Sequence, residues 1–204
     1  QFKGKTAILV GAAPSLDQHT EWIQQNQKHL YIFTVSRLAE KLHNLGIIPD
    51  FIVTVDPLID SFYLGKEAIK FEEKSILIHS YHANPQFVSQ WGGEQLFTGF
   101  RYPWKTAQND DGSEQTGSTV SNAALDSAIT MGFSQILLAG IDFCFNNKGY
   151  THASNTGPAA TQAPMVIEDP SETTVINNLG ENVETLLAFK LAGKEFSKAV
   201  SNNK

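Results

Sequence analysis

Short apolar runs rich in β-branched residues alternate along this chain with segments whose apolar residues recur at helical spacing. The runs predict six strands, at residues 6–10, 31–35, 51–55, 75–79, 95–98 and 136–139. After the second run, Leu38, Leu42 and Leu45 mark one face of a helix that Gly46 can end. Strands that alternate with helices indicate a parallel sheet. We therefore expect an α/β fold, Rossmann-like and three-layered, with a mostly parallel sheet of about six strands and helices on both faces.

The stretch 117–153 combines the clearest helix and strand signals with polar residues. Ser118 or Thr119 can cap a helix, and the apolar positions that follow recur at helical spacing until Gly132. The run 136–139 is continuously apolar, which is typical of a parallel strand covered on both faces. Because ligands of open α/β sheets bind beyond the carboxyl ends of strands, we expect the chemistry just after this strand.

Three other segments complete the pattern. Residues 100–116 and 146–175 lack helical or strand periodicity, and long loops in compact domains are commonly functional. We expect 146–175 to be a mobile lid. At the C-terminus, Asn178 and Glu181 predict a capping box. The apolar face of the helix that it would open consists of Val183, Leu186, Leu187 and Leu191.

Composition narrows the class of protein. The chain has 204 residues, 41% hydrophobic and 18% charged, which favours one globular domain over residues 1–204. Its net charge of −6 and the absence of a Lys/Arg run argue against a nucleic-acid partner. Cys144 is the only cysteine, so no internal disulfide can form, and a cytoplasmic setting fits. No apolar stretch is long enough to span a membrane. Because the chain opens at Gln1 almost directly into a strand, we expect it to be part of a longer protein.

The first strand leads into a small-residue turn that is compatible with two roles. Gly11 and Ala12 form the turn, Pro14 suits the first turn of a helix, and Ser15 suits its cap. A strand, a tight turn and a helix start together make an anion cradle, although the residues match neither a Walker loop nor G-x-G-x-x-G. A tight turn without a ligand explains the same pattern.

Several polar residues near strand ends have a functional and a plain interpretation. Asp56 can bind a ribose hydroxyl or a metal, or open a turn before Pro57. His79 and His82 lack the third ligand of a zinc site, and no DxD pair is present, so we expect no required metal. His152 suits proton transfer, or is a surface histidine.

Four short motifs resemble those of the motility accessory factor family. They are GAAPSL at 11–16, GSTVS at 117–121, GIDF at 140–143 and YTHA at 150–153. That family is implicated in attaching nonulosonic acids, such as pseudaminic acid, to flagellin. More distantly, the motifs are similar to those of bacterial sialyltransferases that use CMP-sialic acid. They are also similar to those of archaeal 6-hydroxymethylpterin diphosphokinases, which use ATP and magnesium.

The resemblance implies a glycosyltransferase that binds a CMP-activated sialic- or pseudaminic-type sugar and transfers it to a hydroxyl acceptor, with flagellin as a candidate partner and no cofactor. It implies His152 as general base and Tyr150 as a phosphate contact. The nucleotide-binding residues that it implies are Gly11, Ala12, Pro14, Ser15, Ser36, Asp56, Gly117, Ser118, Thr119, Gly140 and Asp142.

Two alternatives stay open. In a diphosphokinase, Asp56 and Asp142 would hold Mg²⁺ between the phosphates of ATP. In a binding module without catalysis, the nucleotide site would remain while the chemistry is lost. Ala13, where the sialyltransferases have a second glycine, and Cys144, where they have a tyrosine, favour this last interpretation.

Overall fold

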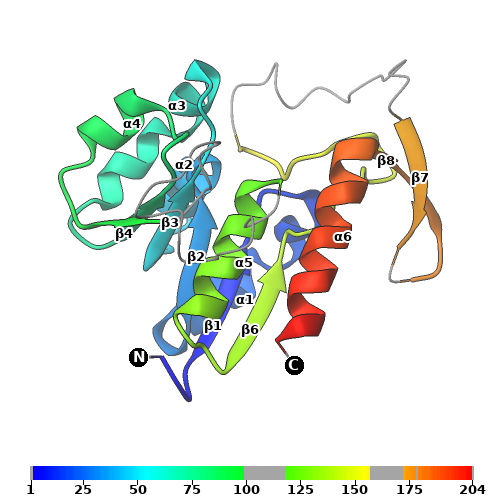
Figure 1. Ribbon diagram of the computed structural model, residues 1–204, viewed down its shortest axis with the longest axis horizontal. Helices are drawn as coiled ribbons and strands as arrows, with labels where there is room; N and C mark the ends of the chain where they lie inside the picture. Colours follow the sequence, from blue (N-terminus) through cyan, green and yellow to red (C-terminus); the bar gives the residue numbers. More distant parts are fainter. Residues whose placement is uncertain (1, 99–117, 157–171, 178, 204) are drawn as a thin grey trace, which may run out of the picture.

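The computed structural model describes residues 2–98, 118–156, 172–177 and 179–203. Its centre is a six-stranded sheet, all parallel, with the order β5-β4-β3-β2-β1-β6 (Figure 1). The strands are β1 (Thr6–Val10), β2 (Tyr31–Val35), β3 (Phe51–Thr54), β4 (Ile76–His79), β5 (Gln95–Phe97) and β6 (Gln135–Ala139). The predicted α/β class and the six strands are confirmed.

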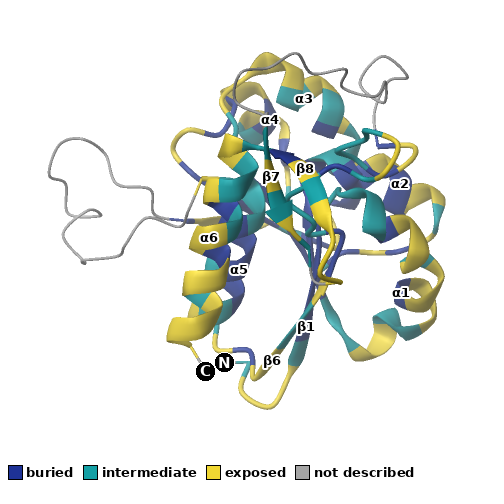
Figure 2. Ribbon diagram, turned by 90° about the vertical axis from the view of Figure 1, so that its right-hand side faces the viewer, coloured by how far each residue is buried: buried dark blue, intermediate teal, exposed yellow. Residues whose placement is uncertain are grey.

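Helices cover both faces of this sheet and make three layers. The α-helices are α1 (Thr20–Asn26), α2 (Ala39–Asn44), α3 (Ile59–Gly65), α4 (Pro85–Gln90), α5 (Val120–Thr130) and α6 (Leu187–Asn202). Short 3-10 helices lie at Pro14–Gln18, Gln27–His29, Ser36–Leu38 and Lys66–Phe71. Figure 2 shows α5 and α6 on one side of the sheet, with α1 and α2 on the other. We call these sides the α5 face and the α1 face.

Alternation along the strands divides the core between these faces. Ile8, Ile32 and Ile52 are buried with residues of α1, α2 and α4 on the α1 face. Leu9 and Phe33 are buried with residues of α5 and α6 on the α5 face. Because successive side chains of a strand point to opposite faces, one apolar run supplies both cores. Each large apolar side chain buried in this way contributes roughly 1.5–3 kcal/mol.

The start and end of α5 follow the sequence prediction. Thr119 is the N-cap residue, and its hydroxyl oxygen accepts a hydrogen bond from the amide of Asn122 at 3.4 Å. Gly132, just after the helix, has φ +83°. This is the left-handed conformation that a glycine adopts without steric cost. Ala124 and Ala128 are buried against the sheet, so the helical spacing correctly indicated the inward face.

The predicted burial of the last strand is wrong. Among the described strands β6 pairs with β1 alone and forms one edge of the sheet, with Gln135 exposed and Leu138 49% exposed. An apolar run alone does not distinguish an edge strand from a central one, because it does not indicate which strands and helices will pack beside it.

The predicted start of the C-terminal helix is also wrong, and Asn178 of the expected capping box lies outside the described residues. β7 (Glu172–Ile176) and β8 (Asn182–Leu186) form an antiparallel hairpin, and α6 begins only at Leu187. In the turn, the side-chain oxygen of Asn177 accepts the amides of Leu179 and Glu181, both at 2.9 Å. Ala192 and Phe196 form the buried side of α6, whereas Leu187 and Leu191, assigned to the inward face, are about half exposed. Cross-strand pairing here overrides the helical spacing of the leucines.

Candidate functional site

A pocket of about 210 Å³ lies at the carboxyl edge of the sheet, where the ends of β1, β2, β3 and β6 meet. Its walls include Ala12, Ser36, Asp56 and Gly140, one from each of these strand ends. Thr119 and Ser121 at the start of α5, and His152 from the loop after β6, complete it. Five of the predicted nucleotide-binding residues and the predicted base therefore share one pocket, which we call the carboxyl-edge pocket. The pocket lies at the end of β1, which has β2 on one side and β6 on the other. The strand order changes direction at this point, and open α/β sheets bind their ligands at such a point.

Gly11 and Gly140 bring the ends of β1 and β6 into close backbone contact. A Cβ atom on Gly11 would lie 2.4 Å from the carbonyl oxygen of Gly140, and one on Gly140 would lie 2.2 Å from that of Gly11. The amide of Gly11 donates to Ala139 at 2.8 Å, and that of Ala13 donates to Gly140 at 3.0 Å. Both glycines thus have a packing role. Ala13 has φ −78°, so the residue that replaces the second glycine is unstrained.

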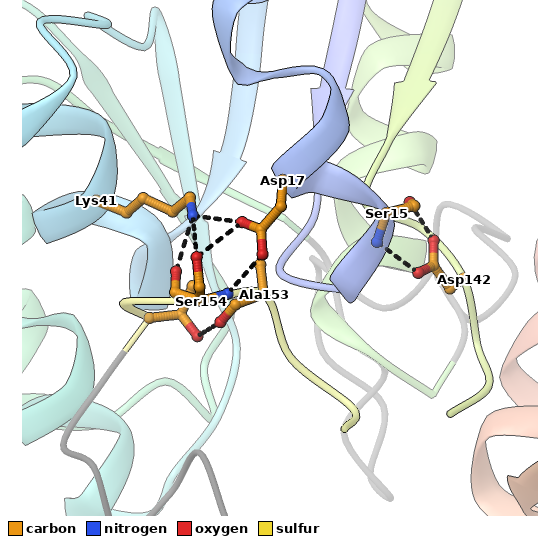
Figure 3. Close-up of polar contacts among 7 residues, drawn as sticks. Ser15, Asp17, Lys41, Asp142, Ala153 and Ser154 are labelled. Atoms are coloured by element: carbon orange, nitrogen blue, oxygen red, sulfur yellow. Dashed lines mark hydrogen bonds and ion pairs between the residues drawn. The ribbon is translucent and has the colours of Figure 1, made fainter. Parts of the chain in front are cut away.

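Ser15 and Asp142 join the opening turn to the loop after β6 (Figure 3). One carboxylate oxygen of Asp142 accepts the amide of Ser15 at 2.9 Å, and the other accepts its hydroxyl. With Pro14, both residues line a neighbouring open groove of about 1520 Å³ between this loop, the hairpin and α6. The structure therefore places them beside the carboxyl-edge pocket rather than in its wall.

His152 is held in the pocket by a fastened loop. The amide of Ala153 donates to the carbonyl oxygen of Ala12 at 2.8 Å, and the Thr151 hydroxyl contacts His152 Nδ1 at 2.8 Å. Burial, together with the positive charge of Arg37, lowers the pKa of His152 from 6.5 to about 4. The imidazole is therefore neutral at pH 7 and able to accept a proton.

The same loop is tied to the α1 face by an ion pair (Figure 3). Lys41 Nζ lies 2.6 Å from Asp17 Oδ1 and donates to the carbonyl oxygen of Ser154 at 2.8 Å. The amide of Ser154 donates to Asp17 Oδ2 at 2.9 Å. Although burial opposes ionisation, the hydrogen bonds and charge of Lys41, with Ser154, lower the pKa of Asp17. These bonds hold the backbone at Ser154, two residues after His152, and so restrain the position of the His152 backbone.

Sequence reasoning missed Arg37 and Thr54, which also line the pocket. Thr54 is only 4% exposed, and neither side chain has a hydrogen bond to another described residue. Burial lowers the pKa of the Arg37 guanidinium, while the charge of Asp56 opposes this shift. Asp56 itself accepts the amide of Leu58 at 2.9 Å and so opens the turn before α3. The available signal was a cation two positions after an apolar strand, next to Ser36.

The remaining predicted residues lie elsewhere. Ser118 precedes the cap of α5, where its amide and hydroxyl donate to Glu195 of α6 at 2.8 Å and 2.7 Å. Gly117 lies outside the described residues. Tyr150 closes a turn in which its amide donates to Asn146 Oδ1 at 3.0 Å, and it is not among the residues lining the pocket. Of the expected lid, 157–171 lie outside the described part of the chain, and the lid stays a prediction.

Two surveys of the described residues bear on metal and membrane. In the ranges 2–98, 118–156, 172–177 and 179–203, no three His, Cys, Asp or Glu side chains come together as a metal site. Within those same ranges, no helix combines the length and apolar character needed to cross a bilayer.

Comparison with known proteins identifies a family and a related fold. The model of the family described as 6-hydroxymethylpterin diphosphokinase MptE-like matches residues 1–148. The structure superposes on a MAf glycosyltransferase from Magnetospirillum magneticum AMB-1 with a TM-score of 0.77 and 19% identity. The match covers 100% of this chain but 31% of that protein, and at this identity it establishes the fold. A search of curated protein sequences finds no match.

Proposed function

Because this chain belongs to the 6-hydroxymethylpterin diphosphokinase MptE-like family and has the fold of a MAf glycosyltransferase, we propose that it is the donor-binding part of a glycosyltransferase. Its donor would be a CMP-activated nonulosonic acid, and its acceptor a hydroxyl group, with flagellin as a candidate. The observation that carries this proposal is a neutral histidine fixed in a pocket at the carboxyl edge of the sheet.

In the proposed reaction the acceptor oxygen bonds to the anomeric carbon of the sugar while the bond from that carbon to the CMP oxygen breaks. His152 takes the proton of the acceptor hydroxyl, and CMP leaves with the bonding electrons. Because Nδ1 of His152 contacts the Thr151 hydroxyl, Nε2 is the nitrogen left for this transfer. Ser36, Val120 and Ser121 line the same pocket. Their hydroxyls and amides would stabilise negative charge on the leaving group.

The two predicted donors that lie outside the pocket are consistent with this role. Ser15 and Ser118 each donate an amide and a hydroxyl hydrogen to one carboxylate, of Asp142 and Glu195 respectively. Paired donors of this kind can bind an anion. In the described arrangement the carboxylates of Asp142 and Glu195 accept their hydrogen bonds. Tyr150 would need to turn toward the pocket to contact a phosphate.

The test combines donor hydrolysis with ligand binding. We expect the protein to bind CMP in EDTA and to release CMP slowly from CMP-N-acetylneuraminate when water is the acceptor. His152→Gln should reduce this release by roughly 10²–10⁴-fold, the usual contribution of a general base, while CMP affinity changes little. Equal release by both proteins would remove His152 from the chemistry, and failure of cytidine nucleotides to bind would overturn the proposed donor.

A second candidate, a diphosphokinase that uses ATP and Mg²⁺, is favoured by the description of the family model. Its expected metal ligands, Asp56 and Asp142, do not fit one shared site here. Asp56 lines the carboxyl-edge pocket, whereas Asp142 lines the neighbouring groove with both oxygens bonded to Ser15. Calorimetry with ATP and with CMP, each in EDTA and in magnesium, separates the candidates. A tenfold gain in ATP affinity with magnesium, about 1.4 kcal/mol, would favour the diphosphokinase.

A further inference from the structure

Arg37 is a cation in the carboxyl-edge pocket. It forms no salt bridge with any described residue. It follows Ser36 in the 3-10 helix Ser36–Leu38, between the buried side chains of Ser36 and Leu38. We propose that Arg37 is the residue of this pocket that receives the anionic group of the ligand, a phosphate or a sugar carboxylate, next to His152. The inference rests on the proposed function only for the identity of that ligand.

The first argument is that Arg37 is desolvated and that the charge of Asp56 compensates for this only in part. The salt bridges between described residues join Lys41 to Asp17 and Lys70 to Glu67, and neither involves Arg37. Burial lowers its pKa, which means that the surroundings disfavour the charged guanidinium. Because guanidinium stays protonated in proteins, this cost remains until an anion with matching geometry approaches. A phosphate or a carboxylate has that geometry.

The second argument comes from neutral donors in the same pocket. Ser36 is 8% exposed and Thr54 is 4% exposed, and neither hydroxyl has a partner among the described residues. A side chain at position 65 would lie 2.9 Å from the Ser36 hydroxyl, so Gly65 leaves the room that Ser36 occupies. Buried hydroxyls are normally hydrogen-bonded. Within the described ranges, these two hydroxyls and the Arg37 guanidinium are therefore a set of donors that can bind an acceptor.

The third argument is the direction of α5. This helix of 11 residues begins in the wall of the pocket, with Thr119, Val120 and Ser121 lining it. The first amides of a helix lack intrahelical partners and carry a partial positive charge, which favours an anion. Asp56 is the opposing charge in the pocket, but it forms no salt bridge with Arg37 and accepts a hydrogen bond from the amide of Leu58.

An anion at Arg37 would change the chemistry of His152. The titratable or charged residues that line the pocket are Arg37, Asp56, Cys144 and His152, and the lining residues of α3, α5 and α6 carry none. Burial is the larger cause of the low pKa of His152, and the charge of Arg37 is the second. An anion bound to Arg37 cancels the second cause, so ligand binding raises the pKa of His152 and makes it a stronger base.

The experiment follows His152 by NMR in the intact protein, with its signal assigned from the spectrum of His152→Gln. The probes are inorganic phosphate, CMP, cytidine and N-acetylneuraminate. In the wild-type protein we expect saturating CMP to raise the pKa of His152. In Arg37→Gln the pKa of free His152 should already be higher, and CMP should not raise it further.

Affinities provide the second readout. Arg37→Gln should weaken CMP binding by roughly tenfold to a hundredfold, as expected for a hydrogen bond to a charged group. Lys5→Gln, which removes one exposed charge just before β1 at the opposite edge of the sheet, is the matched control and should leave CMP affinity unchanged. Arg37→Lys keeps the charge but loses the planar pair of donors. It should therefore preserve the low pKa of His152 and still weaken CMP, even if Arg37→Gln fails to fold.

The probes also identify the group that Arg37 receives. Loss of CMP affinity with unchanged cytidine affinity assigns a phosphate, whereas loss of N-acetylneuraminate affinity alone assigns a carboxylate. Equal weakening of cytidine and CMP, or a pKa of His152 that ignores every anion, overturns the proposal. If phosphate acts through Arg37 while cytidine nucleotides bind no better than others, the anion site stands and the proposed donor is wrong.

Discussion

At the scale of single residues, His152 combines a position in the carboxyl-edge pocket with a cost in stability at low pH. Its pKa of about 4 in the folded protein lies below its ordinary value of 6.5. Between these two pH values the unfolded chain binds a proton that the folded protein does not. The free energy of unfolding must therefore fall as the pH is lowered through this window, and this loss is complete below pH 4.

Replacing His152 should make this pH dependence weaker. Between pH 6.5 and 4 we expect His152→Gln to lose about 2 kcal/mol less stability than the wild-type protein, because glutamine does not take up a proton. Solvent screening of the partly exposed imidazole keeps this difference below the value that the full pKa shift would give. Urea unfolding at several pH values measures the difference. Replacement of the exposed His29 by Gln controls for loss of an imidazole, and parallel profiles for wild type and His152→Gln would contradict the low pKa.

The sequence reveals residues whose role is local and conceals those whose role depends on distant partners. Thr119 and Gly132 could be assigned because capping and helix termination depend on the adjacent backbone. The Asp17–Lys41–Ser154 network could not, because Lys41 and Ser154 are 113 positions apart. Arg37 was missed for the same reason, since its position matters only beside His152 and Asp56.

At the scale of elements, the loop that carries His152 depends on this network for its position. Asp17→Asn would leave the buried ammonium of Lys41 without its counter-charge and weaken the bond from the amide of Ser154. We expect a loss of about 1–3 kcal/mol in the free energy of unfolding, and faster hydrogen exchange at the amide of Ser154.

The exposed pair Glu67–Lys70 is the matched control for Asp17→Asn. The side chain of Lys70 is 52% exposed, in contrast to 8% for that of Lys41. Glu67→Gln should therefore change stability by less than about 0.5 kcal/mol. Similar losses for the two substitutions would show that burial of Lys41 is not what makes the network matter.

The contact between the ends of β1 and β6 can be tested with two glycines of similar backbone conformation. Gly140 has φ +66° and Gly132 has φ +83°, so an alanine is strained at both positions by about 1–2 kcal/mol. Only at Gly140 would its Cβ also meet a backbone oxygen, at 2.2 Å, whereas nothing lies within 4 Å at Gly132. Gly140→Ala should be the more destabilising by about 1–3 kcal/mol in thermal unfolding. Equal losses would mean that the two strand ends can move apart.

The C-terminal segment shows how two element signals can compete. Leu186, Leu187 and Leu191 recur at helical spacing, which favoured one helix. Residues 182–186 instead pair with 172–176, a strand in a region without detectable periodicity. The pattern does not reveal the hairpin partner, and pairing with that partner shifts the start of the helix to Leu187. The existence of the helix was therefore predictable, but its first residue was not.

At the scale of the whole molecule, the sequence predicted the three layers correctly but not which strands lie at the edges of the sheet. Strands alternating with helices give a parallel sheet with covered faces whatever the strand order. The position of β6 beside β1, outside the other strands, depends on packing of α5 against the sheet, which pattern reasoning did not determine. The pocket was predictable as a location, the carboxyl edge, because that location depends only on the layers.

Pairing of β1 with β6 has a consequence for how the protein folds. Thr6 and Gln135, which lie side by side in this pair, are 129 positions apart in the chain. β1 can pair with β2 early, but its other side stays open until nearly the whole sheet has been made. Contacts between such distant segments are slow to form, because the loop between them must first lose its freedom. Gly140, Phe143 and His152, which follow β6, can join Ala12 and Arg37 only after this step. We therefore expect the carboxyl-edge pocket to be among the last parts of the molecule to form, so that a ligand bound there would stabilise the finished fold without guiding its assembly.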